Sequence, residues 1–168
     1  WWSSTSACIR ETLEKAGIAG GDIDGVSFSG QMHGTVMLDG ADKPVAPAVI
    51  WADTRSEAES EELTGLLGET RLRSIVMNRM FPGTQAATIR WMMTHDSAAW
   101  KRTRRILTPK DYLRFRMCGL FNTEPSDASA TLLFDTGKRE WSDEILKMLT
   151  IPVEFLPYVV NSDQYIAE

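Results

Sequence analysis

The chain has 168 residues, of which 43% are apolar and 24% are charged, and its formal net charge at pH 7 is −5. This length and composition predict one globular domain with a hydrophobic core. The acidic balance argues against binding along a nucleic-acid backbone, and no apolar run approaches the roughly 20 residues that cross a bilayer. We therefore expect neither a nucleic-acid partner nor a membrane partner.

The first part of the chain predicts one helix followed by three short strands. Apolar residues recur on one helical face over residues 5–16, with a Ser/Thr cluster in front as the expected cap and Gly17 behind. After a Gly-rich turn, apolar and polar residues alternate over 26–29, a period of two that is typical of a half-buried strand. Two further strands are expected at 35–38 and 48–51, separated by turn residues.

The middle of the chain predicts two helices. Thr54 and Glu57 have the spacing of a capping box, so a helix is expected to begin there and to run to Leu67, with Gly68 ending it. A second helix is expected to begin near Thr84 and to bury the apolar residues Ile89, Met92 and Met93.

The last third of the chain predicts two strands and two helices. A strand is expected at 105–107, and Thr108 followed by Pro109 then signals a helix that Gly119 ends. A strand at 131–134 and a helix opened by Ser142 complete the order. Strands alternating with capped helices indicate an α/β domain, and the short connections predict a mixed sheet flanked by helices.

Cysteines and histidines limit the redox and metal chemistry of the chain. Cys8 and Cys118 show neither paired nor metal-binding spacing, and His33 and His95 are the only histidines. We therefore expect no disulfide framework and no metal site, and a reducing cytoplasm as the location.

The most informative stretch for chemistry is the turn from Ser29 to Gly34. It places Gln31, Met32 and His33 between glycines just past an expected strand end. Ligands of α/β proteins often bind beyond strand ends, and glycines let the backbone approach a substrate closely. A lone histidine in a turn is more often a structural hydrogen-bonding residue, so both interpretations stay open on these grounds.

Four ordered blocks resemble one protein family, the FGGY carbohydrate kinases. The blocks are residues 25–55, 107–114, 126–131 and 141–143, and they follow that family's order and spacing. The Gly-Gln-Met-His-Gly signature within the first block resembles that of the xylulokinase branch. The resemblance spans nearly the whole chain.

The resemblance implies a sugar pocket and names its residues. It implies that Gln31, Met32 and His33 bind the substrate, with the imidazole hydrogen-bonded to sugar hydroxyls. It also implies that Trp51 lies against the carbon chain of the sugar, for which an indole face is suited. Core packing is an equal alternative for Trp51, and it is the preferred interpretation of Met80.

The resemblance implies an actin-like, ribonuclease H-like architecture in which the sugar and ATP meet between two domains. Residues 1–168 would form a partial N-terminal, sugar-binding domain. The first phosphate-binding hairpin and the C-terminal ATP-binding domain would lie outside the chain, and so would the catalytic aspartate. We therefore expect no catalytic residue and no metal ligand here. ATP and Mg²⁺ would belong to the intact enzyme, and this piece alone would bind neither and be inactive.

Two positions depart from the pattern of the family. Ala52 stands where many relatives have Asn, and Ala130 stands where they have Gly, so the geometry of both loops is in question. Several charged residues near these blocks are interpreted first as helix-start, cap or surface residues: Asp53, Arg55, Lys110, Asp111 and Asp127.

The leading functional interpretation is part of a kinase that phosphorylates D-xylulose to D-xylulose 5-phosphate. A kinase for another ketose or polyol, and a carbohydrate-binding module without activity, are the alternatives. An unpaired strand edge would favour a homodimer. A nucleic-acid role is the least favoured, because it would depend on one basic cluster at Lys101, Arg102, Arg104 and Arg105, which we interpret as a solvated helix end.

Overall fold

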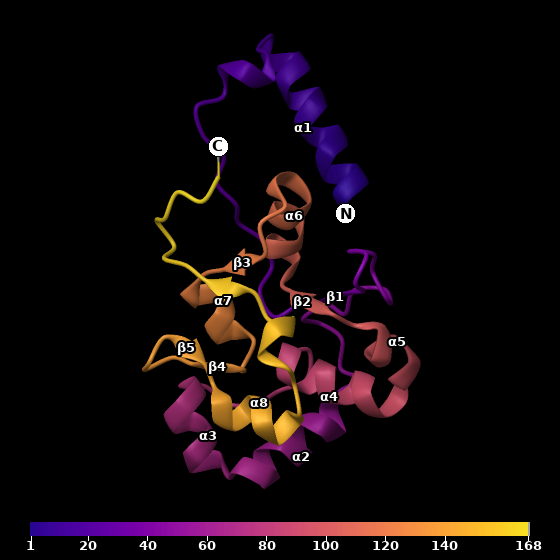
Figure 1. The fold of residues 1–168 in the computed structure, drawn as a ribbon, viewed down its shortest axis with the longest axis vertical. Helices are drawn as coiled ribbons and strands as arrows, with labels where there is room; N and C mark the ends of the chain where they lie inside the picture. Colours follow the sequence, from indigo (N-terminus) through magenta and orange to yellow (C-terminus); the bar gives the residue numbers. More distant parts are fainter. Residues whose placement is uncertain (168) are drawn as a thin grey trace.

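The computed structural model describes residues 1–167, which form short strands surrounded by helices (Figure 1). The α-helices of this part are α1 (Trp2–Ala16), α2 (Glu57–Leu67), α3 (Glu69–Val76), α4 (Gln85–His95), α5 (Ser97–Arg102), α6 (Pro109–Cys118), α7 (Pro125–Ala130) and α8 (Asp143–Leu149). The strands are β1 (Val36–Leu38), β2 (Arg105–Leu107), β3 (Asn122–Thr123), β4 (Phe134–Asp135), β5 (Glu140–Trp141) and β6 (Tyr158–Val159). None of these helices is long and apolar enough to cross a membrane.

The strands form three separate pairs within the described residues. β1 and β2 are antiparallel with Val36 opposite Leu107, β4 and β5 are antiparallel, and β3 and β6 are parallel. The mixed strand directions confirm the prediction. The prediction of a single small sheet is wrong, since the structure has three two-stranded ladders. Each strand is only two or three residues long.

Two apolar clusters hold these elements together. The larger cluster joins α2, α3, α4 and α8, which lie together at one end of the molecule, and it buries Leu63, Ile89 and Ile145 completely or nearly so (Figure 1). The smaller cluster packs β1 and β2 against α6, with Leu38 and Phe115 among its members. The smaller cluster therefore fixes the β1 and β2 ladder against the start of α6.

The helix α1 stands apart from both clusters. It lies at the opposite end of the molecule from α2, α3 and α8 (Figure 1), and none of its residues is buried. Its first turn rests on α6, where the guanidinium of Arg116 lies 5.4 Å from the Trp2 ring centroid. The helix begins before the Ser/Thr cluster that was expected to cap it, so that cap prediction is wrong, but Gly17 ends the helix as predicted, with φ of 68°.

The predictions based on capping residues are largely confirmed. The Thr108 hydroxyl accepts a hydrogen bond from the Asp111 amide at the start of α6, and the Ser142 hydroxyl accepts one from the Ile145 amide at the start of α8. Gly119 ends α6 in the left-handed conformation. The helix near Thr84 is α4, and β1 and β2 match their predicted ranges closely.

Four predictions of local structure are wrong. Residues 26–29 form no strand, and the alternating pattern there finds no neighbouring strand among the described residues. The region 48–51 contributes a single bridge, between Val49 and Thr35. At 131–134 the chain turns, with Leu132 at φ of 60°, so the strand begins only at Phe134. The helix α2 begins at Glu57 without the predicted capping box, since the Glu57 amide donates to the Thr54 carbonyl.

Candidate functional site

The turn that carries His33 is held in a specific conformation. His33 has φ of 67°, in the left-handed region that non-glycine residues seldom adopt. Its Nδ1 atom lies 2.7 Å from the carbonyl oxygen of Ala130, and its ring meets the Phe81 ring edge-on at a centroid distance of 5.1 Å. Two contacts from distant parts of the chain therefore fix this half-buried imidazole.

Gly34, the residue after His33, contacts two helices. The Gln85 side chain, which is 2% exposed, donates to the Gly34 carbonyl at 3.0 Å. A Cβ atom added to Gly34 would lie 2.6 Å from the Pro109 side chain, so only glycine fits at this distance from the start of α6. The turn is therefore attached to both α4 and α6.

Two apolar side chains of the predicted site lie on the surface. Trp51 is 58% exposed and Met32 is 56% exposed. The core-packing alternative for Trp51 is therefore wrong. Met80 is buried in the larger apolar cluster, which confirms the core interpretation of that residue.

The loop that contains Trp51 contacts the segment from Phe81 to Gln85, which also contacts His33. Gly83, at φ of 82°, lies so close to the Trp51 carbonyl that an added Cβ atom would approach it to 2.4 Å. The Gly83 amide also donates to the Ser56 hydroxyl at 3.3 Å. The segment from Phe81 to Gln85 thus contacts both loops that the sequence singled out.

Gln31 is half-buried beside Met32. Asp53 and Arg55 form a bidentate ion pair of 2.7 and 2.9 Å, and the hydrogen bond from Arg55 lowers the pKa of Asp53. The Arg55 guanidinium lies 4.9 Å from the Trp91 ring centroid, on the surface of α4. Asp53 and Arg55 therefore stabilise each other, as a surface pair.

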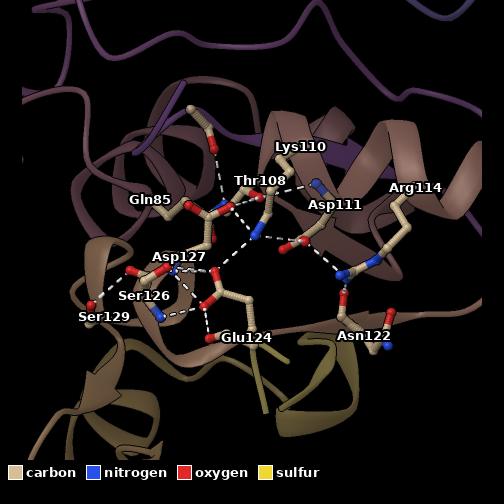
Figure 2. A network of polar contacts seen from close by, with 12 residues as sticks. Gln85, Thr108, Lys110, Asp111, Arg114, Asn122, Glu124, Ser126, Asp127 and Ser129 are labelled. Atoms are coloured by element: carbon tan, nitrogen blue, oxygen red, sulfur yellow. Dashed lines mark hydrogen bonds and ion pairs between the residues drawn. The ribbon is translucent and has the colours of Figure 1, made fainter. Parts of the chain in front are cut away.

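A buried charge network joins α6 to α7, and it was not predicted from the sequence (Figure 2). Lys110 Nζ lies 2.8 Å from Glu124 Oε1 and 3.2 Å from Asp127 Oδ2. The Thr108 hydroxyl donates to Asp127 at 2.9 Å. All four residues lie at the start of one of these two helices. Lys110 is therefore a helix-start residue, as predicted, and it also forms these ion pairs.

Asp111 and Arg114 extend this network along α6. Arg114 Nη2 lies 2.9 Å from Asp111 Oδ1 and also donates to the Asn122 carbonyl (Figure 2). Asp111 is completely buried, and burial raises its pKa against the opposing effect of Lys110 and Arg114. Arg114 therefore links the buried carboxyl of Asp111 to the backbone at Asn122.

The pKa values of Lys110 and Glu124 move apart because each stabilises the charge of the other. Burial lowers the Lys110 pKa, but the hydrogen bond to Glu124 and the neighbouring carboxylates outweigh it, so the pKa is raised. Burial likewise raises the Glu124 pKa, and hydrogen bonds from Lys110, Ser126 and the Asp127 amide reverse this, leaving the pKa far below its usual range. Both groups are charged at neutral pH.

A cavity of about 590 Å³ borders this network. Its wall contains Lys110, Arg114 and Glu124, together with residues 23–28, 162 and 164–167 near the two ends of the chain. None of the four predicted substrate residues lines it. The cavity is therefore separate from the turn that carries His33.

Comparison with known proteins defines the class to which this arrangement belongs. The family model for the N-terminal domain of the FGGY family of carbohydrate kinases matches residues 1–168, so the chain belongs to that family. Among curated proteins it is similar to the xylulose kinase of Bacillus subtilis, with 36% identity over 96% of this chain and 32% of the relative. It is also similar to the xylulose kinase of Lactococcus lactis, with 41% identity over 85% of this chain and 28% of the relative.

Solved structures agree with this assignment. The crystal structure of a xyloylose kinase from Brucella ovis matches 96% of this chain with a TM-score of 0.85 and 34% identity, using 32% of that protein. The xylulose kinase structure from Bifidobacterium adolescentis has the same fold over 95% of this chain, with a TM-score of 0.82 at 22% identity. The chain spans about a third of the length of the curated relatives it matches.

Proposed function

We propose that this chain is the sugar-binding part of an ATP-dependent kinase that phosphorylates the 5-hydroxyl of D-xylulose. The observation that carries the proposal is the His33 turn, which holds an imidazole by Nδ1 and leaves Nε2 without a hydrogen-bond partner among the described residues. The similarity to xylulose kinases supports the choice of sugar.

The residues that we assign to substrate binding suit a small polyhydroxylated molecule. Sugars present hydroxyls that need hydrogen-bond partners and a carbon chain that needs apolar contact. His33 supplies a nitrogen for the first, and the exposed side chains of Met32 and Trp51 supply apolar surface for the second. Gln31 is the further polar group that we assign to substrate binding.

We also propose that the described residues form no nucleotide site of their own. The cations nearest to the largest charge cluster, Lys110 and Arg114, are already paired with carboxylates. Phosphoryl transfer also requires a phosphate-binding backbone, a metal and a base that orients the sugar hydroxyl. We propose that other parts of the whole enzyme supply ATP binding, Mg²⁺ and the catalytic aspartate, and that this piece alone is inactive.

The proposal is tested by calorimetric titration of D-xylulose into a full-length kinase that carries this segment. Replacing His33 by Ala should weaken binding by about 1–3 kcal/mol, the cost of losing a buried hydrogen bond. The matched control is His95→Ala, since His95 is exposed at the end of α4. An unchanged affinity in the His33 variant would remove this residue from the pocket.

A panel of ketoses and polyols in a coupled assay separates the alternatives. Preferential turnover of D-xylulose supports the proposal, and faster turnover of another sugar assigns the enzyme to that substrate. Sugar binding without turnover in the full-length protein would indicate a carbohydrate-binding module. A cytoplasmic location and a homodimer stay predictions, and sedimentation of the purified protein tests the second.

A further inference from the structure

We infer that Thr108, Lys110 and Asp127 are positioning residues that fix the His33 tautomer through α7, so that His33 recognises a hydroxyl by accepting its hydrogen. The inference rests on the proposed function only for the identity of that ligand group. The tautomer itself follows from contacts within this chain.

The first step concerns the proton on the imidazole. The Ala130 carbonyl oxygen can only accept a hydrogen bond, so the Nδ1 atom 2.7 Å from it must carry a hydrogen. In the neutral ring Nε2 then has a lone pair and no hydrogen. The structure gives Nε2 no partner among residues 1–167 and does not bury it, so this lone pair is free to accept from a ligand.

The second step concerns the carbonyl that selects this tautomer. Ala130 is the last residue of α7, and the final carbonyls of a helix have no partner within the helix. Its oxygen therefore points out of the helix end and is available to the imidazole. The position of this oxygen depends on where α7 ends, and hence on how α7 is held.

The third step concerns how α7 is held. A helix of six residues is too short to be stable by itself, so its placement depends on tertiary contacts. At the start of α7, the Glu124 carboxylate accepts a hydrogen bond from the Asp127 amide and forms an ion pair with Lys110 at 2.8 Å. The Asp127 carboxylate forms a second ion pair with Lys110 at 3.2 Å and accepts a hydrogen bond from the Thr108 hydroxyl at 2.9 Å. These contacts attach the first turn of α7 to α6 (Figure 2), and the last residue of α7 supplies the carbonyl of Ala130.

The consequence is a rule for the ligand group that meets His33. A lone pair on Nε2 accepts from an alcohol, whereas a keto oxygen, a carboxylate or a phosphate oxygen offers no hydrogen there. We therefore expect a sugar hydroxyl, and not the carbonyl of a ketose, to face this nitrogen.

Nitrogen NMR of the imidazoles in this chain tests the tautomer directly. His33 and His95 are its only histidines, so two-bond ¹H–¹⁵N correlation spectra contain two ring systems. We expect His33 to show a protonated Nδ1 and an unprotonated Nε2. A His33 ring protonated on Nε2 alone, or on both nitrogens at neutral pH, would overturn the inference.

Variants at the start of α7 test the positioning role. Thr108→Val removes both the hydroxyl bond to Asp127 and the cap on the Asp111 amide with little change of shape, whereas Asp127→Asn weakens the bond to Lys110 and keeps that cap. Each should introduce the tautomer with hydrogen on Nε2 for His33 and leave the His95 signals unchanged, while Thr108→Ser should restore the original pattern. Unchanged His33 spectra in both folded variants would overturn the positioning role, and backbone spectra show whether each is folded.

Ligand analogues test the recognition rule in a full-length kinase carrying this segment. Replacing one hydroxyl of D-xylulose by fluorine removes a donor and keeps an acceptor. One monofluoro analogue should bind about tenfold more weakly to the wild type, as expected for one net hydrogen bond, and show no such loss in His33→Ala. If the NMR result holds but no analogue behaves in this way, the proposed sugar contact fails while the tautomer assignment stands.

Discussion

The backbone of Gly83 approaches the carbonyl of Trp51 so closely that an added Cβ atom would lie 2.4 Å from its oxygen. Gly83 also has φ of 82°, in the left-handed region. Replacement by Ala should therefore combine a backbone penalty with a steric clash, and we expect a loss of about 2–4 kcal/mol in the free energy of unfolding. Urea denaturation of the chain measures this loss.

Gly119 provides a control that separates the two effects. It has φ of 74° in the left-handed conformation, but an added Cβ would meet no atom within 4 Å. Gly119→Ala should therefore cost only about 1 kcal/mol, from the backbone alone. Equal losses for the two variants would show that the contact between Gly83 and Trp51 is not tight in solution.

Lys110 should be a major contributor to stability. Its side chain is 10% exposed and lies between Glu124 and Asp127, so Lys110→Met would leave two carboxylates buried without their cation. Breaking a buried ion pair in this way costs about 3–5 kcal/mol. Chemical denaturation at pH 7 measures the change.

The matched control is Lys147→Met. The Lys147 side chain is 79% exposed and pairs with exposed Asp143 at 3.4 Å, an arrangement that contributes at most about 1 kcal/mol. A similar small loss for Lys110→Met would mean that its carboxylate partners are solvated in the folded protein.

The sequence predicted the elements whose signals are local. Thr108 and Ser142 mark helix starts because a hydroxyl caps an amide three residues away, and Gly119 marks a helix end because it adopts positive φ without strain. The strand at 26–29 failed because alternation describes one strand and cannot supply the neighbour that a ladder needs. The helices α3, α5 and α7 are too short to show a clear period.

The candidate site was predictable only in part, for the same reason. The glycines around the turn of His33 were visible in the sequence, but its partner Ala130 lies 97 residues away and contributes a backbone atom. Lys110 is visible as a charge next to a helix start, but its carboxylate partner Glu124 is 14 residues distant. Contacts of this kind depend on packing, and no local pattern encodes them.

The free energy of unfolding should fall at low pH because Glu124 becomes protonated. The folded-state pKa of this carboxyl is depressed well below its usual value, first by the hydrogen bond from Lys110. A depressed pKa contributes stability that is fully present above the unfolded value, about 4.3, and that is lost as pH falls below it. Glu124→Gln should therefore flatten the decline in unfolding free energy between about pH 5 and pH 3.

Asp111 should have the opposite effect on how the free energy of unfolding depends on pH, so it serves as the control. Its pKa is raised by burial, so its ionisation removes stability as pH rises from the unfolded value through the folded one. Asp111→Asn should remove that loss and steepen the net decline toward acid. Identical pH profiles for wild type and Glu124→Gln would contradict the assignment of Glu124 as the buried partner of Lys110.

Gln85 should hold the turn of His33 in place through a single hydrogen bond. Its side chain donates to the Gly34 carbonyl at 3.0 Å, and Gln85→Leu would leave that carbonyl without this donor at a buried position. The expected loss in unfolding free energy is about 1–3 kcal/mol. Hydrogen exchange should also accelerate at the Thr35 amide, which donates to Val49 beside the turn. Gln164→Leu, at an exposed position, should leave both quantities unchanged, and a Gln85 variant with the same exchange rate as wild type would show that α4 does not restrain the turn.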